Sequence, residues 1–221
     1  MRNPKHTAFT LIELLTVIAI IGILAAIIIP VTGKVRSSAA NAQCKTALRN
    51  YGVAIQMYVN DNRDKLPGPC YGFVKRDMLL ESQKHLFGYI APYISLQSAI
   101  GKLPDNYLCS LLLKKAVKPA EPNIAVYKLA GKVKTGPDKD DRSWPMGYPT
   151  SETTTDPVRT YGFVAGYNTP SQTKALHDVD YENGVDDTKR DALPLKPVHG
   201  NHRNVLFFDW HVGTEPVTPS P

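Results

Sequence analysis

The sequence predicts an α+β protein in which one long N-terminal helix packs on a C-terminal antiparallel β-sheet. An apolar run over residues 9–29 is followed by apolar residues at helical spacing up to about residue 60. Two segments rich in β-branched and aromatic residues, 159–167 and 204–212, are predicted strands. The chain has 221 residues, 43% of them apolar, which is enough for one folded domain with an appendage.

Residues 9–30 are expected to form a transmembrane helix. At ~1.5 Å per residue, 21 apolar residues extend about 30 Å, which matches one hydrocarbon core. The only charge in this run is Glu13, and a carboxylate in an apolar segment needs a partner. Pro30 lacks a backbone N–H and Gly22 adds backbone freedom, so these two residues predict a kink or a locally melted stretch.

A short polar leader, residues 1–8, precedes the apolar run and carries Arg2 and Lys5. These charges place the N-terminus in the cytoplasm by the positive-inside rule, which sends the rest of the chain across the membrane. An ordinary secretory signal is cut after its apolar run, whereas the polar-to-apolar boundary here, between Ala8 and Phe9, comes before it. The apolar helix would therefore survive processing.

Residues 8–15, AFTLIELL, and the long apolar helix after them resemble the class III signal of type IV prepilins and type II secretion pseudopilins. The resemblance implies that a prepilin peptidase cuts between Ala8 and Phe9 and that the new amino group of Phe9 is N-methylated. It also implies a role for Glu13 in filament assembly. These families usually carry Gly where this chain has Ala8, and the alternative is an uncleaved signal anchor.

Residues 31–62 are expected to continue as an amphipathic helix into a globular domain, and the Asn- and Pro-rich sequence that follows ends it. Residues 63–221 would form an exported α+β domain with a C-terminal β-hairpin. The predicted buried stripe of the helix consists of Val31, Val35, Ala39, Ala42, Leu48, Tyr51, Ile55 and Tyr58 or Val59.

The middle of the chain gives weaker signals. Residues 77–93 suggest a short helix, and residues 107–113 form a short apolar run that suits either a strand or a buried helix. Residues 123–129 alternate as a strand does. Residues 131–156 are rich in Gly, Pro, Asp, Ser and Thr, so we expect an exposed loop.

The C-terminal part carries a second resemblance. His199 is followed by nine residues and then Asp209, and the segment from Asn204 to Asp209 reads NVLFFD. This resembles the His, nine residues, Asp-Gly signature of prepilin-type proteins abundant in planctomycetes and their relatives, which implies a C-terminal β-hairpin. Trp210 stands where Gly is expected, so a tight turn is in doubt and we expect a wider hairpin.

Four side chains in this region, His199, His202, Asp209 and His211, have metal-binding and acid–base chemistry. No nucleophile, oxyanion loop or ligand helix accompanies them. We therefore favour a structural interpretation in which His199 and Asp209 make hydrogen bonds that fix the loop before the hairpin, and we predict no enzymatic activity.

The densest carboxylate cluster includes Asp178, Asp180, Asp186 and Asp187. Alternating oxygens around a Gly turn suit Ca²⁺, which accepts six to eight oxygen ligands, although the spacing is one residue longer than that of an EF-hand. Major pseudopilins bind calcium in a C-terminal loop, and the match to that loop is loose. The alternative is a solvated acidic loop without metal.

The chain has three cysteines in a domain expected outside the cytoplasm, where disulfides persist. Cys70 and Cys109 both fall in loop-rich sequence, whereas Cys44 lies within the long helix. We therefore predict a Cys70–Cys109 disulfide, and three free thiols are the alternative.

The formal net charge is +6, but it is unevenly distributed, with residues 34–134 basic and residues 138–221 acidic. Such asymmetry suits head-to-tail packing of identical subunits, and without a nucleic-acid motif we do not expect nucleic acid to be a partner. The resemblance implies a structural subunit of a filament, a pseudopilin or minor pilin of the bacterial inner membrane, whose partners are the prepilin peptidase, other pseudopilins and an inner-membrane assembly platform. The alternative is an adhesin or ligand-binding module that uses Trp144 and Tyr148.

Overall fold

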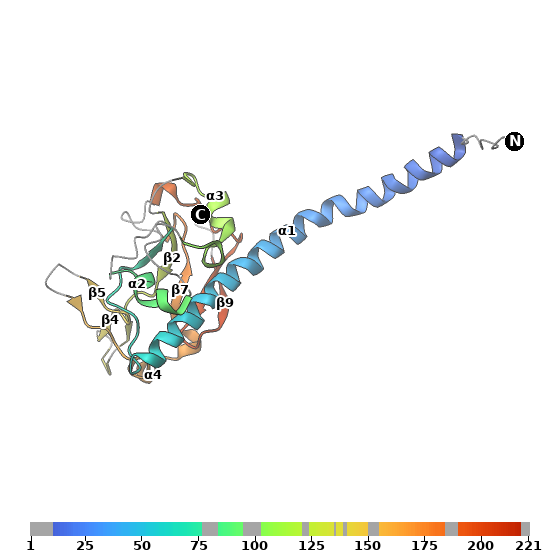
Figure 1. Cartoon of the computed structure of the whole chain (residues 1–221). Coiled ribbons are helices and arrows are strands. Elements are labelled where there is room, and N and C mark those ends of the chain that lie inside the picture. The colour runs from blue at the N-terminus through green and yellow to red at the C-terminus, as the bar shows by residue number, and fades with distance from the viewer. Residues whose placement is uncertain are drawn as a thin grey trace, which may run out of the picture. The chain divides into compact units, whose positions relative to one another are not determined.

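The computed structural model describes residues 11–76, 84–94, 103–120, 124–134, 136–138, 141–149, 155–183 and 190–217. The chain divides into two compact units, Met1–Ala39 and Ala40–Pro221. Figure 1 labels the elements, and the first of them, helix α1 (Leu11–Asp61), contributes to both units. Its C-terminal part packs on an antiparallel sheet in the second unit, which confirms the predicted α+β class.

Helix α1 has 51 residues and runs without interruption past Gly22 and Pro30. A locally melted stretch at Pro30 was therefore the wrong expectation. The missing N–H of Pro30 leaves one carbonyl without its helical donor, which is the loss of a single bond in a helix of 51 residues. The kink itself stays a prediction.

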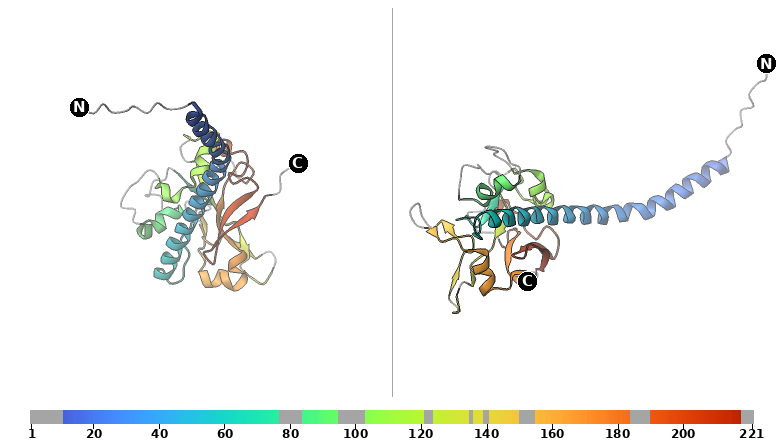
Figure 2. Two further views of the ribbon diagram at one scale, coloured as in Figure 1. Left: turned by 90° about the vertical axis from the view of Figure 1, so that its right-hand side faces the viewer. Right: turned by 60° about the horizontal axis from the view of Figure 1, so that its bottom comes forward.

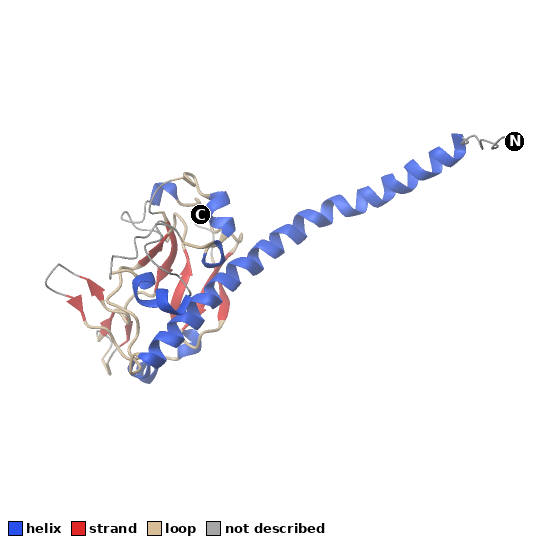
Figure 3. Cartoon of the chain, in the orientation of Figure 1, coloured by secondary structure: helices blue, strands red, loops and turns tan. Residues whose placement is uncertain are grey.

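The sheet of the second unit has five described strands, and each neighbouring pair is antiparallel. In spatial order they are β1 (Phe73–Lys75), β2 (Ala125–Leu129), β7 (Lys174–Asp178), β8 (His202–Phe207) and β9 (Val212–Pro216). Figure 3 shows these strands in red beside the C-terminal part of α1, and Figure 2 shows the same layers from two other sides. The predicted strand over 123–129 and the predicted C-terminal hairpin are both confirmed.

The core lies between α1 and the sheet. Tyr51, fully buried on α1, meets the rings of Phe87, Tyr107 and Tyr127 edge-on, each with centroids 5.4 Å away. Edge-to-face aromatic pairs add about 0.5–1.5 kcal/mol each beyond the area they bury. The buried face of α1 comprises Cys44, Ala47, Leu48, Tyr51, Gly52, Ala54, Ile55 and Val59. The predicted stripe is thus confirmed from Leu48 onward.

Four members of the predicted stripe are exposed instead: Val31, Val35, Ala39 and Ala42. The first three belong to the other compact unit, and burial begins with Cys44. An apolar pattern at helical spacing looks the same whether a sheet or a lipid phase covers it, which is why the sequence did not show where the globular domain begins.

Several weaker predictions are resolved by short elements around the sheet. The segment 159–167 was predicted as a strand, which is wrong, because Tyr161–Tyr167 forms helix α4. The Thr160 side chain accepts a hydrogen bond from the Phe163 N–H, and the Asp64 carboxylate accepts one from the Gly162 N–H. Two N–H groups of the first turn are thus satisfied, which favours the helix over a strand.

Elsewhere the predictions differ in outcome. The ambiguous run 107–113 is partly helical, in α3 (Ser110–Lys115), and within 77–93 the described part forms α2 (Leu86–Ile90), continued by η1 (Ala91–Ile94). The expected loop 131–156 contains short antiparallel strand pairs, β3 (Val133–Lys134) with β4 (Arg142–Ser143) and β5 (Tyr148–Pro149) with β6 (Thr155–Asp156). Further short helices are η2 (Asp105–Tyr107), η3 (Pro170–Gln172) and η5 (Arg190–Ala192). Strand β7 was not predicted.

Candidate functional site

The first candidate site is the apolar surface of α1 within the first compact unit. Among the described helices, α1 alone is long and apolar enough to cross a membrane. The large apolar side chains that it exposes in residues 11–39 are Leu11, Ile12, Leu14, Leu15, Val17, Ile18, Ile20, Ile21, Ile23, Leu24, Ile27, Ile28, Ile29, Val31 and Val35. They surround the helix, and a helix that is apolar on all sides belongs in a protein core or a membrane.

Glu13 lies in the first described turns of this helix and is exposed. Its backbone carbonyl accepts a hydrogen bond from the Thr16 hydroxyl at 3.0 Å. A carboxylate near the N-terminus of a helix is stabilised by the helix dipole. Ala8 and Phe9, the predicted processing site, lie outside the described residues.

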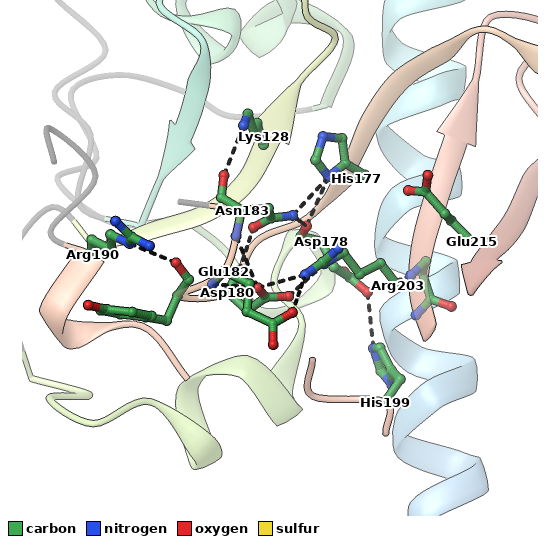
Figure 4. A network of polar contacts seen from close by, with 12 residues as sticks. Lys128, His177, Asp178, Asp180, Glu182, Asn183, Arg190, His199, Arg203 and Glu215 are labelled. Atoms are coloured by element: carbon green, nitrogen blue, oxygen red, sulfur yellow. Dashed lines mark hydrogen bonds and ion pairs between the residues drawn. The ribbon is translucent and has the colours of Figure 1, made fainter. Parts of the chain in front are cut away.

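The second candidate site is a polar network where the acidic turn after β7 meets β8 (Figure 4). The Asp180 carboxylate accepts two hydrogen bonds from the Arg203 guanidinium, at 2.6 and 2.9 Å. The same carboxylate accepts the backbone N–H groups of Glu182 and Asn183, at 3.0 and 3.3 Å. Burial opposes the charge of Arg203, but the hydrogen bonds and charge of Asp180 raise the pKa of Arg203. The network fixes the turn to the sheet.

This network changes the interpretation of the acidic cluster. Asp180, predicted as a calcium ligand, has its two oxygens occupied by an arginine and by backbone donors. Asp178 accepts the Asn204 N–H at 2.7 Å through Oδ2. Asp186 and Asp187 lie outside the described residues. Calcium at this loop therefore stays a prediction, and in this arrangement Asp180 acts as the partner of a cation.

His199 contacts Asp178, and Asp209 contacts a different residue. Nε2 of His199 lies 3.3 Å from Oδ2 of Asp178, and both side chains are almost fully buried. Asp209 is instead paired with the His211 ring across the hairpin turn. The predicted role of His199 in fixing the loop before the hairpin therefore involves Asp178, a residue that sequence reasoning had assigned to calcium.

The histidines do not form one catalytic group. The rings of His199 and His202 stack with centroids 5.7 Å apart, whereas His211 stacks on Phe207 at 4.5 Å. Burial, followed by the charges of His199 and Lys45, lowers the pKa of His202. The sequence signal that could have identified the network is Arg203, a basic residue placed next to the buried Asn204 on the predicted strand.

The disulfide joins Cys44 to Cys109, with Cα atoms 4.4 Å apart, and Cys70 is a free, buried cysteine. The predicted Cys70–Cys109 pairing is therefore wrong. Cys44 lies on the buried face of α1, and the Gln43 and Ser110 side chains next to the two cysteines are hydrogen bonded at 3.0 Å. Burial raises the pKa of the Cys70 thiol, which keeps that thiol protonated and unreactive.

The hairpin turn between β8 and β9 is longer than the two-residue turn of a tight Asp-Gly hairpin, in agreement with the expectation of a wider hairpin. The Trp210 N–H donates to the Phe207 carbonyl at 2.9 Å, and the Phe207 N–H donates to the His211 carbonyl at 3.0 Å. Between the strand ends lie Phe208, Asp209, Trp210 and His211, with Trp210 at φ +68° in the left-handed region. This conformation costs a residue with a Cβ atom about 1–2 kcal/mol.

Packing offsets the strain at Trp210. Its indole stacks on Tyr161 with centroids 5.6 Å apart. The hairpin also approaches α1 closely at Gly52. A Cβ added to Gly52 would lie 3.6 Å from the Cβ of Trp210 and 3.0 Å from the Leu206 side chain. A large aromatic side chain thus holds the hairpin turn against the helix.

We expect Trp210→Gly to be more stable than Trp210→Ala by about 1 kcal/mol, measured by chemical unfolding of the full chain in detergent. Both variants lose the indole, but only alanine keeps a Cβ at positive φ. At Thr214, an exposed residue of strand β9, the same comparison should give the opposite order. Equal stabilities of the two Trp210 variants would contradict a strained turn.

The ligand-binding alternative predicted a site at Trp144 and Tyr148, whereas the structure has a hollow at a different place. These two rings stack with centroids 5.1 Å apart, and both residues are half-buried. A hollow of about 550 Å³ lies elsewhere, lined by Ala130, Gly131, Lys132, Val133, Lys134, Arg142, Asn168, Gln172, Thr173 and Lys174. Four of these side chains are cationic, and Lys174 among them is paired with Glu215, so the other three suit an anionic ligand better than an aromatic-stacking one.

The match to a known family concerns the N-terminal segment. The family model described as "Prokaryotic N-terminal methylation motif" matches residues 3–29. Together with the exposed apolar helix and the α+β fold, this match supports a type IV pilin-like protein with a class III prepilin motif.

A curated relative agrees with this class. Over 47 residues the chain is 51% identical to "Type IV major pilin protein PilA" of Myxococcus xanthus (strain DK1622), a stretch that covers 21% of each chain. The chain thus matches about a fifth of the length of this relative. No solved structure shows a significant match to the chain.

Proposed function

We propose that the chain is a structural subunit, a pseudopilin or minor pilin, of a type II secretion or type IV pilus-like filament. The observation that carries the proposal is the methylation motif at residues 3–29, which runs directly into a helix that exposes apolar side chains all around its first half. An apolar helix of this kind suits two environments in turn, first a lipid bilayer and then a bundle of like helices in a filament.

The proposed history of the subunit follows from this motif. The chain waits in the bacterial inner membrane with its N-terminus in the cytoplasm and its second unit in the periplasm. Prepilin peptidase cuts between Ala8 and Phe9, the new amine of Phe9 is methylated, and an inner-membrane assembly platform transfers the subunit into the filament. Loss of Arg2 and Lys5 lowers the formal net charge from +6 to +4.

Glu13 has a defined role in this proposal. A carboxylate costs ~2.5–3.5 kcal/mol at the centre of a membrane helix and less near its end. In a filament, the amine of Phe9 of a neighbouring subunit would offset this cost with its opposite charge. Enzymatic activity is not part of the proposal, because a filament subunit works through its surfaces.

We expect intact-mass analysis of membrane-extracted protein to show a mature chain that begins at Phe9 and carries one methyl group. Ala8→Phe should block cutting and leave membrane insertion intact, since the leader charges and the apolar helix are unchanged. Ala19→Phe, the same change at an exposed position of α1, should be cut normally. Met1 retained in cells with an active peptidase would falsify the proposal.

A separate readout tests assembly. Glu13→Ala should be cut as the parent chain is, but its recovery in sheared filaments should fall well below that of Glu13→Asp, which keeps the charge. Equal recovery of Glu13→Ala and the parent chain would remove the carboxylate from the assembly mechanism.

A further inference from the structure

Two sulfur atoms and one imidazole nitrogen meet in the core of the second unit. Cys44 comes from α1, Cys109 directly precedes α3, and His199 comes from the loop before β8. One ligand atom of each lies within 4.8 Å of those of the other two. The His199 side chain is only 1% exposed. Three segments far apart in sequence thus bring metal-binding side chains to one buried point.

The unmet hydrogen-bonding capacity of this point is the second observation. Within the described part of the chain, Nδ1 of His199 and Oδ1 of Asp178 are buried and have no hydrogen-bond partner. The contact between His199 Nε2 and Asp178 Oδ2 is 3.3 Å, whereas a charge-assisted N–H···O bond is about 2.7–2.9 Å. This long contact leaves Nε2 of His199 available to a stronger ligand, whereas an ion bound at Nε2 would still leave Nδ1 without a partner.

We propose that the thiol form of Cys44 and Cys109, together with His199, binds a divalent zinc-class ion. A tetrahedral zinc ion with Zn–S of about 2.3 Å and Zn–N of about 2.05 Å places a sulfur and a nitrogen ligand about 3.6 Å apart. Sγ of Cys109 lies 3.7 Å from Nε2 of His199. The ring and this sulfur therefore already have the separation of two ligands of one ion.

The remaining ligands require small movements. Two thiolates on one zinc ion lie about 3.8 Å apart, so the sulfurs must separate from bonding distance by side-chain rotation. Two ligands of nitrogen and oxygen lie about 3.3 Å apart, which equals the distance from Nε2 of His199 to Oδ2 of Asp178. Asp178 supplies the fourth ligand if it approaches the sulfurs, and otherwise a water molecule does.

The disulfide and the ion exclude each other. A dithiol reductant gives two electrons and two protons to the disulfide, which yields two thiols and converts the reductant to its own disulfide. Binding of the ion then displaces the two thiol protons and leaves two thiolates on the metal. The disulfide and the metal-bound dithiol both connect α1 to the segment before α3. The ion would therefore hold the same elements together in a chain whose cysteines have not been oxidised.

The test uses the full chain in detergent, reduced without oxygen and freed of reductant, and titrated with Co²⁺. We expect a thiolate-to-cobalt charge-transfer band that saturates at one ion per chain and disappears when Zn²⁺ is added. The oxidised chain should give no band. Absence of the band in the reduced chain overturns the proposal if the chain keeps its near-ultraviolet circular dichroism and is therefore folded. It also overturns the proposal if the reduced chain has lost this circular dichroism and added metal does not restore it.

Variants assign the ligands. Cys44→Ser and His199→Ala should lose the band, and Cys70→Ser should keep it because Cys70 is outside the cluster. Asp178→Asn should weaken Zn²⁺ binding about 10–100-fold, the range found when a neighbouring carboxylate of a zinc ligand is changed. A band that depends on Cys70 but not on His199 would place the metal elsewhere and refute the site.

Discussion

Replacing Cys44 with alanine is expected to lower the free energy of unfolding of the oxidised chain by about 4 kcal/mol. The Cys44–Cys109 disulfide joins residues separated by 65 positions. In the chain-entropy model, closing a loop of this length lowers the conformational entropy of the unfolded chain, which stabilises the folded state by about 4 kcal/mol at 25 °C. The measurement is chemical unfolding of the full chain in detergent, followed by near-ultraviolet circular dichroism, which reports on the buried tyrosines around α1.

The three cysteines provide their own controls. Cys109→Ala should cost the same as Cys44→Ala, and the double variant should cost little more, because either single change already breaks the bond. Cys70→Ala removes only a small buried side chain and should cost about 1 kcal/mol. A loss for Cys70→Ala as large as that for Cys44→Ala would contradict the pairing in the structure.

The parts of the fold that local pattern determines were predictable. Leu48, Tyr51 and Ile55 repeat at helical spacing, and they are buried on α1 as that spacing requires. The β-branched and aromatic run of β8 needs a paired, half-buried surface, and it pairs with β9 in the expected hairpin. In both places propensity, pattern and tertiary packing favour the same structure.

The wrong predictions concern places where contacts with distant segments of the chain determine the local structure. Helix α4 was predicted as a strand because its aromatic residues suit a sheet. Its first turn is stabilised by the Gly162 N–H, which donates a hydrogen bond to the carboxylate of Asp64, 98 residues earlier. Cys44 was set aside because it lies in a helix, although it falls on the same face as Leu48. A single sequence contains the period of a helix but not which loop its face will meet.

The candidate sites divide in the same way. The methylation motif is a local sequence signal, so residues 8–15 indicated it without any structure. The acidic cluster also has a local signal, but the sequence cannot distinguish carboxylates that share an ion from carboxylates that share an arginine. The answer for Asp180 depended on Arg203, which follows it by 23 residues and reaches it only because β8 returns beside β7.

Asp180→Ala is expected to lower the free energy of unfolding by about 3–5 kcal/mol, because it leaves the charge of Arg203 buried without its partner. The Asp180 side chain is 1% exposed and that of Arg203 13%. The change also removes the acceptor of two backbone N–H groups in the turn, at Glu182 and Asn183. Urea unfolding of the full chain in detergent at neutral pH gives the measurement.

Two further variants distinguish the cost of leaving Arg203 without its partner from a general destabilisation of the acidic turn. Glu182→Ala removes an oxygen 3.1 Å from the same guanidinium, but this side chain is partly exposed, so the loss should stay below about 1 kcal/mol. Asp180→Ala combined with Arg203→Met should be more stable than Asp180→Ala alone, since methionine removes the unpaired charge and retains apolar contact. If the two losses simply add, Arg203 is not held by Asp180, and the acidic turn is fixed by its backbone hydrogen bonds instead.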